Sequence, residues 1–299
     1  MGEGTLYIKE MRPGIFLLDE DHESTGYLVI GEDRALLIDT MNGHVNLKNE
    51  MEKLTDKPID VINTHGHPDH VHGNIYFEEV YIHPGDLELA NMFNYDPEFI
   101  KFCREKERED PDYARTVQMR RKKTATKMDT EGQSRSAHSP EEDIEPYLST
   151  FRFVKEGDEL DLGGRHLKIY ENPGHTPGQI LLLLPEERIL FTGDSINHHL
   201  WAQFPDCPPM SKIVENLDRI MFLENEADLI LHGHAHDFDD ISLLRCMRDG
   251  AQEIVDGKTE KDEPYFYFGG EVRQHPFKCL PGKNYQQDDH VICYMPENI

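Results

Sequence analysis

Residues 64–74 read THGHPDHVHGN, a stretch with four histidines and one aspartate. Imidazole and carboxylate groups bind borderline metal ions such as zinc, iron and manganese. His65 and His67 are two positions apart, so an extended backbone projects both side chains to the same side. Asp69 and His70 are adjacent and converge only if the chain turns tightly, which the neighbouring glycine and proline favour. The spacing therefore predicts a metal site where a strand ends in a turn.

The segments around this stretch alternate between strand-like and helix-like patterns. Short apolar, β-branched runs predict strands at 27–30, 35–39, 59–63, 80–83, 151–154, 166–170, 180–184, 188–191 and 228–232. Helical patterns cover 46–54, 211–224 and 241–256, and a long polar helical segment begins near 86. Strands that alternate with helices predict an α/β chain.

Three later motifs place further polar side chains at strand ends. KIYENPGHTPGQ puts His175 in a turn just beyond a predicted strand, and RILFTGDS puts Asp194 directly after another. ADLILHGHAH puts His232, His234 and His236 at the end of a third strand. Since α/β sheets place their sites at the carboxyl ends of strands, these groups are expected to meet at one sheet edge.

The composition narrows the classes of partner and compartment. The formal net charge is −27, which disfavours binding to nucleic acid, so the expected partner is a small-molecule substrate. No apolar run is long enough to cross a membrane, and the N-terminus lacks the pattern of a secretory signal. The five scattered cysteines contain no CxxC pair, which is typical of reduced thiols in a cytoplasmic protein.

The ordered motifs resemble those of the metallo-β-lactamase superfamily. The matching segments are HGHPDH (65–70), NPGHTPGQ (172–179), LFTGD (190–194) and LILHGH (229–234), and LIDT (37–40) resembles that family's second-strand motif. The resemblance covers roughly residues 15–245. It implies an α/β (α+β) fold, a four-layer αββα sandwich of two mixed β-sheets flanked by helices, with a dinuclear metal site at one edge.

The resemblance also implies seven metal ligands shared by two divalent ions. One ion would be bound by His65, His67 and His175, and the other by Asp69, His70 and His234, with Asp194 bridging the two. His234 is preferred to His232 because His232 stands where the family usually has proline. Zinc is the expected metal, with iron or manganese as alternatives.

Further residues near these motifs are candidates for supporting the ligands or contacting substrate. They are Asp39, His72, His198, His199, Trp201 and His236. Asp39 is expected to orient the ligand loop, as ligating histidines commonly require. His72 stands where the family commonly has glycine, and a solvated loop histidine is the alternative to a contact role. The loop that contains Trp201 either lines the substrate pocket or packs as an ordinary amphipathic loop.

The expected activity is that of a metal-dependent hydrolase. Two ions lower the pKa of a shared water from about 16 towards about 7 and stabilise the developing oxyanion, and Asp69 would orient the nucleophile. A small ester, lactone or thioester is the expected substrate class. Three alternatives remain open: a mononuclear iron dioxygenase acting on a sulfur compound, a phosphodiesterase of the same fold, and a non-catalytic metal-binding protein.

The domain prediction is a single domain over residues 1–299 with two additions. Residues 86–148 are expected to form a helical insertion, and residues 258–299 a β-rich C-terminal extension. The sequence leaves open whether either addition covers the metals or forms a homodimer contact.

Overall fold

A computed structural model describes residues 5–93, 133–136, 149–265, 272–280 and 290–299. The chain divides into two compact units. The first comprises Met1–Val154 and Leu162–Arg165, and the second comprises Lys155–Asp161 and His166–Ile299.

The first unit contains a mixed sheet of eight strands. The strands are β1 (Thr5–Arg12), β2 (Ile15–Glu20), β3 (Ser24–Ile30), β4 (Ala35–Ile38), β5 (Ile59–Ile62), β6 (Glu79–Ile82), β7 (Gln133–Ser136) and β8 (Thr150–Phe153). Their order across the sheet is β7-β1-β2-β3-β4-β5-β6-β8. Pairing is antiparallel from β7 to β4 and parallel from β4 to β8. The parallel half brings the ends of β4 and β5 to the same edge, next to Asp39 and His65.

Short helices cover part of this sheet. They are α1 (Leu47–Met51), α2 (Pro68–Val71), α3 (Leu87–Phe93) and the 3₁₀ turns η1 (His72–Tyr76) and η2 (Pro84–Asp86). Leu47 and Met51 of α1 are fully buried against strand residues such as Leu28 and Leu37. This apolar layer holds the sheet in place behind the histidine-rich turn.

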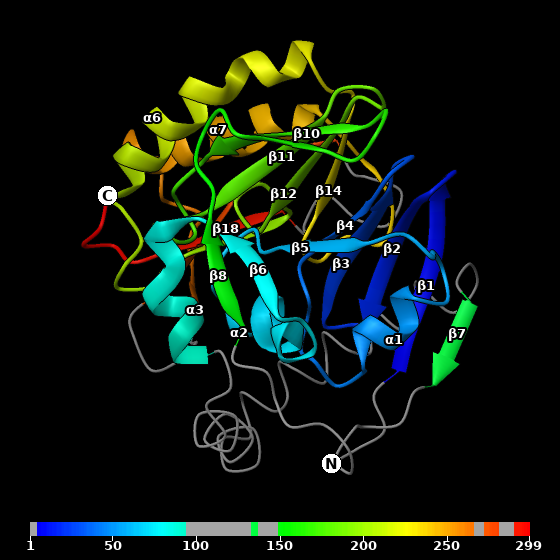
Figure 1. Cartoon of the computed structure of the whole chain (residues 1–299). Helices are drawn as coiled ribbons and strands as arrows, with labels where there is room; N and C mark the ends of the chain where they lie inside the picture. The colour runs from blue at the N-terminus through cyan, green and yellow to red at the C-terminus, as the bar shows by residue number, and fades with distance from the viewer. Residues whose placement is uncertain (1–4, 94–132, 137–148, 266–271, 281–289) are drawn as a thin grey trace. The chain divides into compact units, whose positions relative to one another are not determined.

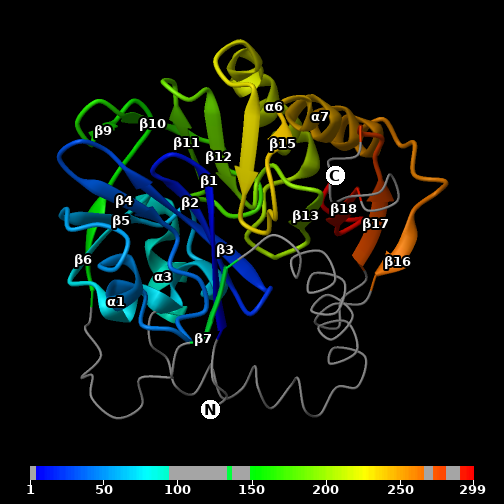
Figure 2. The ribbon, with the colours of Figure 1, turned by 90° about the vertical axis from the view of Figure 1, so that its right-hand side faces the viewer.

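The second unit contains two sheets. The six-stranded sheet has the order β15-β14-β12-β11-β10-β9, with β9 (Glu159–Asp161), β10 (His166–Glu171), β11 (Ile180–Leu184), β12 (Ile189–Gly193), β14 (Leu229–His232) and β15 (Asp239–Asp240). The four-stranded sheet has the order β13-β18-β17-β16, with β13 (His199–Ala202), β16 (Glu263–Tyr265), β17 (Val272–Pro276) and β18 (Val291–Tyr294). Figure 2 shows β16 at the outer edge of this second sheet.

Two amphipathic helices, α6 (Met210–Ile220) and α7 (Ser242–Val255), pack on the six-stranded sheet, and the 3₁₀ turn η3 (Met221–Asn225) follows α6 (Figure 1). Their apolar faces share one core cluster with the buried residues of β11 and β12. Gly250 of α7 lies against the segment after β17, because a Cβ added there would be 2.4 Å from the Cβ of Phe277. The C-terminal strands are therefore part of the core of this unit.

The predicted strands and helices are confirmed, with boundary shifts of one to a few residues. The elements that were not predicted include the strands β1, β2, β9, β13 and β15 and the short helix α2. Within the segment 86–148, which was predicted as a helical insertion, the structure describes α3 and the strand β7, which pairs antiparallel with β1. Residues 94–132, 137–148, 266–271 and 281–289 lie outside the described residues. The prediction of one domain with two additions stays a prediction.

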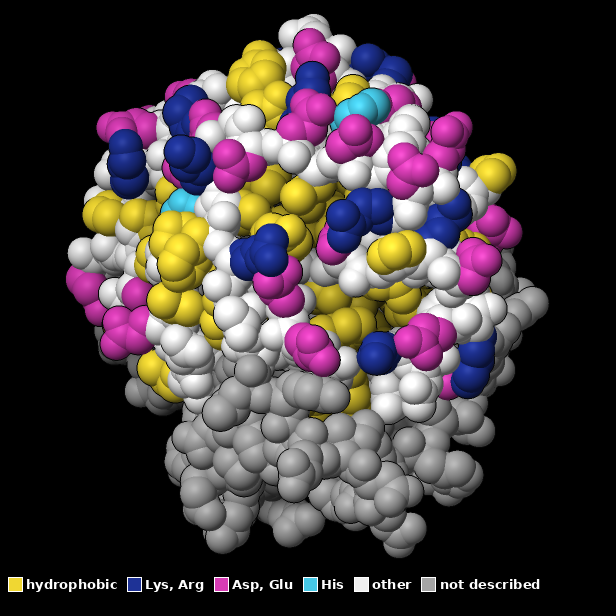
Figure 3. Space-filling model, in the orientation of Figure 1, with side chains coloured by type: hydrophobic (Ala, Val, Ile, Leu, Met, Phe, Trp, Pro, Cys, Tyr) yellow, Lys and Arg dark blue, Asp and Glu magenta, His cyan; other side chains and the backbone are white. Residues whose placement is uncertain are grey.

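Charged side chains of both signs are interspersed over the described surface in Figure 3. Arg248 on α7, for example, pairs with Asp218 on α6 at 2.7 Å between Nε and Oδ1. Among the described residues, none of the helices combines the length and the apolar character that a membrane span requires. The four cysteines in the described part of the chain are free thiols.

A buried acidic group lies at the end of β2. The Glu20 side chain has no exposed surface, and its Oε1 accepts a hydrogen bond from the Val45 N–H at 2.8 Å. Burial, the largest effect, raises the pKa of Glu20 to about 7, against smaller opposing effects from His44 and the Val45 N–H. The folded chain therefore holds a proton on Glu20 at a pH where the unfolded chain does not.

This group makes the stability of the fold depend on pH. Because the pKa of Glu20 is higher in the folded than in the unfolded chain, stability falls as pH rises from about 4.5 to about 7. A shift of this size corresponds to about 3 kcal/mol. We expect Glu20→Gln to flatten this dependence and to be more stable than wild type at pH 8. Chemical denaturation at pH 5 and pH 8 measures it, with the exposed Glu78→Gln as control. Parallel pH curves for wild type and Glu20→Gln would contradict the assignment.

Candidate metal centre

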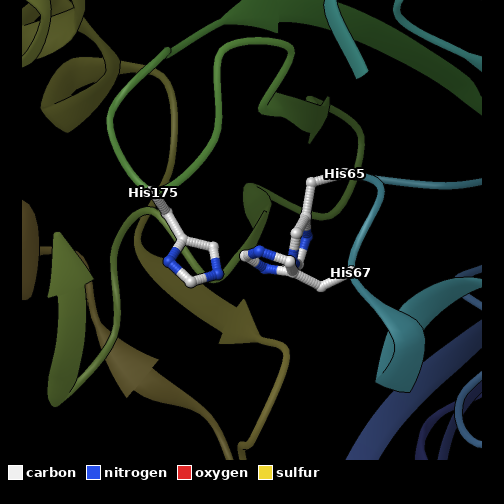
Figure 4. Close-up of side chains that lie close together, drawn as sticks. All are labelled: His65, His67 and His175. Carbon is white, nitrogen blue, oxygen red and sulfur yellow. The ribbon is translucent and has the colours of Figure 1, made fainter. Parts of the chain in front are cut away.

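Four groups of side chains in the described structure have the composition and spacing of metal ligands, and three of them contain the residues predicted as ligands. Within each of these three groups, the ligand atoms all lie within 4.8 Å of one another: His65, His67 and His175; His65, His70 and Asp194; and Asp69, His70 and His234. Figure 4 shows the rings of His65, His67 and His175 directed toward one another. These groups contain all seven of the residues predicted as ligands and no others.

The turn that carries Asp69 and His70 is the short helix α2. Strand β5 ends at Ile62, and His67 precedes the helix as its N-cap, with Pro68 in the first helical position. Proline fits this position because its fixed φ is helical and it has no N–H to leave unsatisfied. The helix turns the chain so that the adjacent Asp69 and His70 can serve one ion. This is the tight turn that the sequence required.

Asp39 holds His70 in one tautomer. The Asp39 carboxylate is buried, and its Oδ2 lies 2.8 Å from the Nδ1 atom of His70. A carboxylate can only accept, so Nδ1 carries the proton and Nε2 carries the lone pair that a metal needs. Asp39 itself has a positive φ of 60°, an unusual backbone conformation of the kind found at functional sites. Its contact fits the predicted orienting role.

Thr64 does the same for His65. The Thr64 hydroxyl donates to Asp39 Oδ2 at 2.7 Å, which uses its only proton. The same oxygen lies 3.1 Å from His65 Nδ1, so it must accept there, and His65 carries its proton on Nδ1. His65 therefore also directs an Nε2 lone pair away from Thr64. The sequence did not identify Thr64, although it directly precedes the first ligand.

In the second unit, backbone and carboxylate contacts arrange the later ligands. The Nδ1 atom of His175 lies 2.7 Å from the carbonyl oxygen of Trp201, which again places the proton on Nδ1 and the lone pair on Nε2. Asp194 Oδ2 is 3.7 Å from His175 Nε2 and 2.9 Å from His234 Nε2. One carboxylate thus lies beside histidines assigned to both ions, as a bridging ligand requires.

Buried polar groups fix the backbone of the ligand turn. The carboxylate of Asp86 is fully buried and accepts the Gly66 N–H at 2.9 Å. The carbonyl oxygen of His70 accepts hydrogen bonds from the Asn63 amide at 2.8 Å and from the Thr40 hydroxyl at 3.1 Å. The sequence analysis missed these residues, since nothing in their local spacing distinguishes them from ordinary turn residues.

The donor set fits two divalent ions of the zinc type. It offers five imidazoles and two carboxylates, and the three histidines whose tautomers the contacts fix all present Nε2. Zinc–nitrogen bonds are about 2.0–2.1 Å, so ligand atoms of one ion lie at most about 4 Å apart. Groups within 4.8 Å need only small side-chain adjustments to share an ion.

The remaining candidate residues lie in varied surroundings. His72 is half-buried at the junction of α2 and η1. His199 lies 3.2 Å from Cys293 Sγ through its Nε2, and its ring is 5.9 Å from that of Trp201, which in turn is 6.2 Å from Phe204. His236 is half-buried beyond β14. Their roles stay predictions.

His198 belongs to a separate buried group with His232 and Asp239, whose ligand atoms also lie within 4.8 Å of one another. Its Nε2 is 3.0 Å from Asp239 Oδ1, and the Nε2 of His232 is 3.2 Å from Asp239 Oδ2. Burial lowers the pKa of His232. Burial alone would raise the pKa of Asp239, but hydrogen bonds with His198 and His232 hold it well below its ordinary value.

The order of the ligand motifs matches a known family. The family model described as "Metallo-beta-lactamase superfamily" matches residues 20–234, more than two thirds of the chain. The chain belongs to the metallo-β-lactamase superfamily. Its fold agrees with a solved metallo-β-lactamase from Pontibacter korlensis, with a TM-score of 0.54 and 16% identity over 83% of this chain and 99% of that one. The predicted fold class is thereby confirmed.

Two relatives within the superfamily carry names that describe thioester hydrolysis. The chain is 27% identical over 254 residues to the acyl-coenzyme A thioesterase MBLAC2 of Gallus gallus, covering 79% of this chain and 83% of that protein. It is 26% identical over 177 residues to the hydroxyacylglutathione hydrolase of Hyphomonas neptunium, covering 58% of this chain and 48% of that protein. The first name describes a thioesterase, and the second describes a hydrolase of hydroxyacylglutathione.

Proposed function

We propose that the protein is a metal-dependent hydrolase of small thioesters, with two divalent ions, expected to be zinc, held by the seven ligands. The observation that carries the proposal is the set of three ligand groups, in which the group of His65, His70 and Asp194 has one histidine in common with each of the other two. The thioester class is supported by the two relatives, which differ in the thiol part of their named substrates but have the thioester bond in common.

The proposed reaction would depend on the bound ions and on the residues that hold their ligands in position. Two bound ions would lower the pKa of a water towards about 7 and stabilise negative charge on the substrate carbonyl oxygen. His65, His70 and His175 keep Nε2 available for the ions because Thr64, Asp39 and the Trp201 carbonyl accept their Nδ1 protons. Fixed protons prevent these rings from flipping as charge develops during the reaction.

Asp69 is the candidate for orienting the attacking water. Its side chain is 35% exposed, compared with 28% for His234 and 10% for Asp194, and its Oδ2 lies 3.8 Å from His70 Nε2. A carboxylate so placed can accept a hydrogen bond from the water and afterwards hold the proton that the water loses. Cys207 plays no nucleophilic part, because it is buried and its thiol donates to the His175 carbonyl oxygen at 3.2 Å.

A substrate panel tests the thioester class. The purified, zinc-loaded chain is given acyl-coenzyme A thioesters, a hydroxyacylglutathione, an oxyester with the same acyl group, a lactone and a phosphodiester. We expect the thioesters to have the highest kcat/KM, measured by thiol release, with the matched oxyester showing the contribution of sulfur. Turnover of the phosphodiester alone would contradict the proposal. A higher kcat/KM for the lactone would support the hydrolase activity but reject thioesters as the substrate class.

A further inference from the structure

The group formed by His198, His232 and Asp239 resembles a third metal site but has a different protonation pattern. All three side chains are at least 95% buried. The contacts that His198 and His232 make with Asp239, 3.0 Å and 3.2 Å, are 0.1 Å and 0.3 Å longer than the 2.9 Å contact between His234 and Asp194 in the candidate metal centre. Distances alone therefore do not separate ligation from hydrogen bonding here, and the position of the protons does.

The backbone of His234 fixes the proton of His232. The His234 N–H points at His232 Nδ1, with 3.2 Å between the nitrogens. A backbone amide can only donate, so His232 Nδ1 must be an acceptor without a proton. The ring of neutral His232 then carries its proton on Nε2, which lies 3.2 Å from Asp239 Oδ2. This tautomer is the opposite of that of the metal-binding histidines, whose Nδ1 atoms are protonated.

Asp239 receives a second donor on its other oxygen. His198 Nε2 lies 3.0 Å from Asp239 Oδ1, and His198 Nδ1 lies 2.6 Å from His290 Nδ1. Two nitrogens this close share one proton. The fully buried His290 thus holds His198 in place, and each oxygen of Asp239 lies within 3.2 Å of an imidazole Nε2.

This chain of contacts ends at a ligand of the metal centre. The residues next to His234 are held by backbone bonds, from the Gly233 N–H to the Gly193 carbonyl oxygen at 2.8 Å and from the Ala235 N–H to the His232 carbonyl oxygen at 3.1 Å. The His234 N–H has the His232 ring as its acceptor instead. The direction in which His234 leaves the backbone therefore depends on an acceptor at His232 Nδ1, and the carboxylate of Asp239 beside His232 Nε2 favours the tautomer that provides it.

We propose that Asp239 is a positioning residue for the metal centre, which acts through the Nε2–H tautomer of His232 to hold the His234 backbone, and that His198, His232 and Asp239 do not bind a metal. This inference rests on the proposed function, because it assumes that His234 binds an ion. It assigns a role to His198, which the sequence placed among candidates for contacting substrate, and to His232, Asp239 and His290.

Two substitution pairs separate this role from simple packing. Asp239→Asn keeps the shape but replaces one acceptor oxygen with a donor, so it cannot accept from both imidazoles. The matched control is the exposed neighbour Asp240→Asn. His232→Phe keeps the ring volume without an acceptor, whereas His232→Asn is smaller but its amide oxygen can accept the N–H two residues along the chain. A packing role favours Phe over Asn, and a positioning role favours Asn over Phe.

The readout is zinc binding by the full chain, measured by competition with a chelating dye and by elemental analysis. We expect two zinc ions per wild-type chain, and a loss of affinity for the weaker ion of about 10- to 100-fold in Asp239→Asn and His232→Phe. Asp240→Asn should match wild type, and His232→Asn should bind more tightly than His232→Phe. Nitrogen-15 spectra of the metal-free protein should show His232 protonated on Nε2.

Several outcomes would overturn the inference. A third zinc ion that Asp239→Asn loses would make the group a metal site. Wild-type affinity in Asp239→Asn, or a proton on His232 Nδ1, would remove the positioning role while the proposed hydrolase survives. A wild-type chain that binds no zinc would instead overturn the proposed function and the inference together.

Discussion

Asp194→Ala is expected to lower kcat/KM for thioester hydrolysis by about 10³-fold or more, because a loss of several kcal/mol of transition-state stabilisation corresponds to this factor. Asp194 belongs to the ligand group with His65 and His70, and its Oδ2 also lies 2.9 Å from His234 Nε2 and 3.7 Å from His175 Nε2. Removing this carboxylate therefore affects both proposed ions at once. Thiol release at fixed zinc concentration measures the effect.

The fold should survive this substitution. Asp194 follows β12 at the sheet edge and is not part of the apolar cluster that holds α6 and α7. Circular dichroism and thermal melting of the metal-free proteins should therefore be close to wild type. Asp206→Ala, which removes an exposed carboxylate from the loop after β13, is the matched control and should retain activity. Equal activity in Asp194→Ala and Asp206→Ala would reject the bridging role.

Removal of metal should abolish activity as completely as any substitution. A chelator followed by desalting is expected to reduce thioester hydrolysis to the uncatalysed rate, since the described site offers ligands in place of a serine or cysteine nucleophile. Adding two equivalents of zinc should restore it, and cobalt or manganese is expected to restore part of it. Undiminished turnover by fully metal-free protein would contradict the mechanism.

The metal content of the purified chain also tests the main alternative. A mononuclear iron dioxygenase shares several of the same histidines, but it would contain one iron and consume oxygen. Two zinc ions per chain and oxygen-independent thiol release support hydrolysis. One iron per chain, together with oxygen consumption when a sulfur compound is added, would show that the protein is a dioxygenase and contradict the proposed hydrolase activity.

Much of the fold was predictable because its signals are local. Apolar runs such as ILLLL at 180–184 form fully buried strands that could be placed from sequence alone. Strand β13 was missed because it has only four residues and its pairing depends on a distant segment, and β1 was missed although its buried residues alternate with half-buried ones, as in a half-exposed strand. β13 pairs with β18, about ninety positions later in the chain, and no local pattern reveals such a partner.

The candidate ligand residues could be named from the sequence for a different reason. Their types and their places at strand ends are visible in the sequence, so the three groups contain the seven predicted residues. Their supports were harder to find. Asp39 was expected, but Thr64, the Trp201 carbonyl oxygen and Asp239 act through single hydrogen bonds whose partners are set by the tertiary structure. The spacing of these residues along the chain does not indicate such contacts.

The pairing of β13 with β18 has a practical consequence for anyone preparing fragments of this protein. The family match ends at residue 234, so an expressed fragment could be designed to end there. Such a fragment would keep every metal ligand, yet β13 would lose its strand partner and His198 would lose His290. Crystallisation or labelling should therefore begin from a chain that retains its last residues, with any affinity tag placed at the other end.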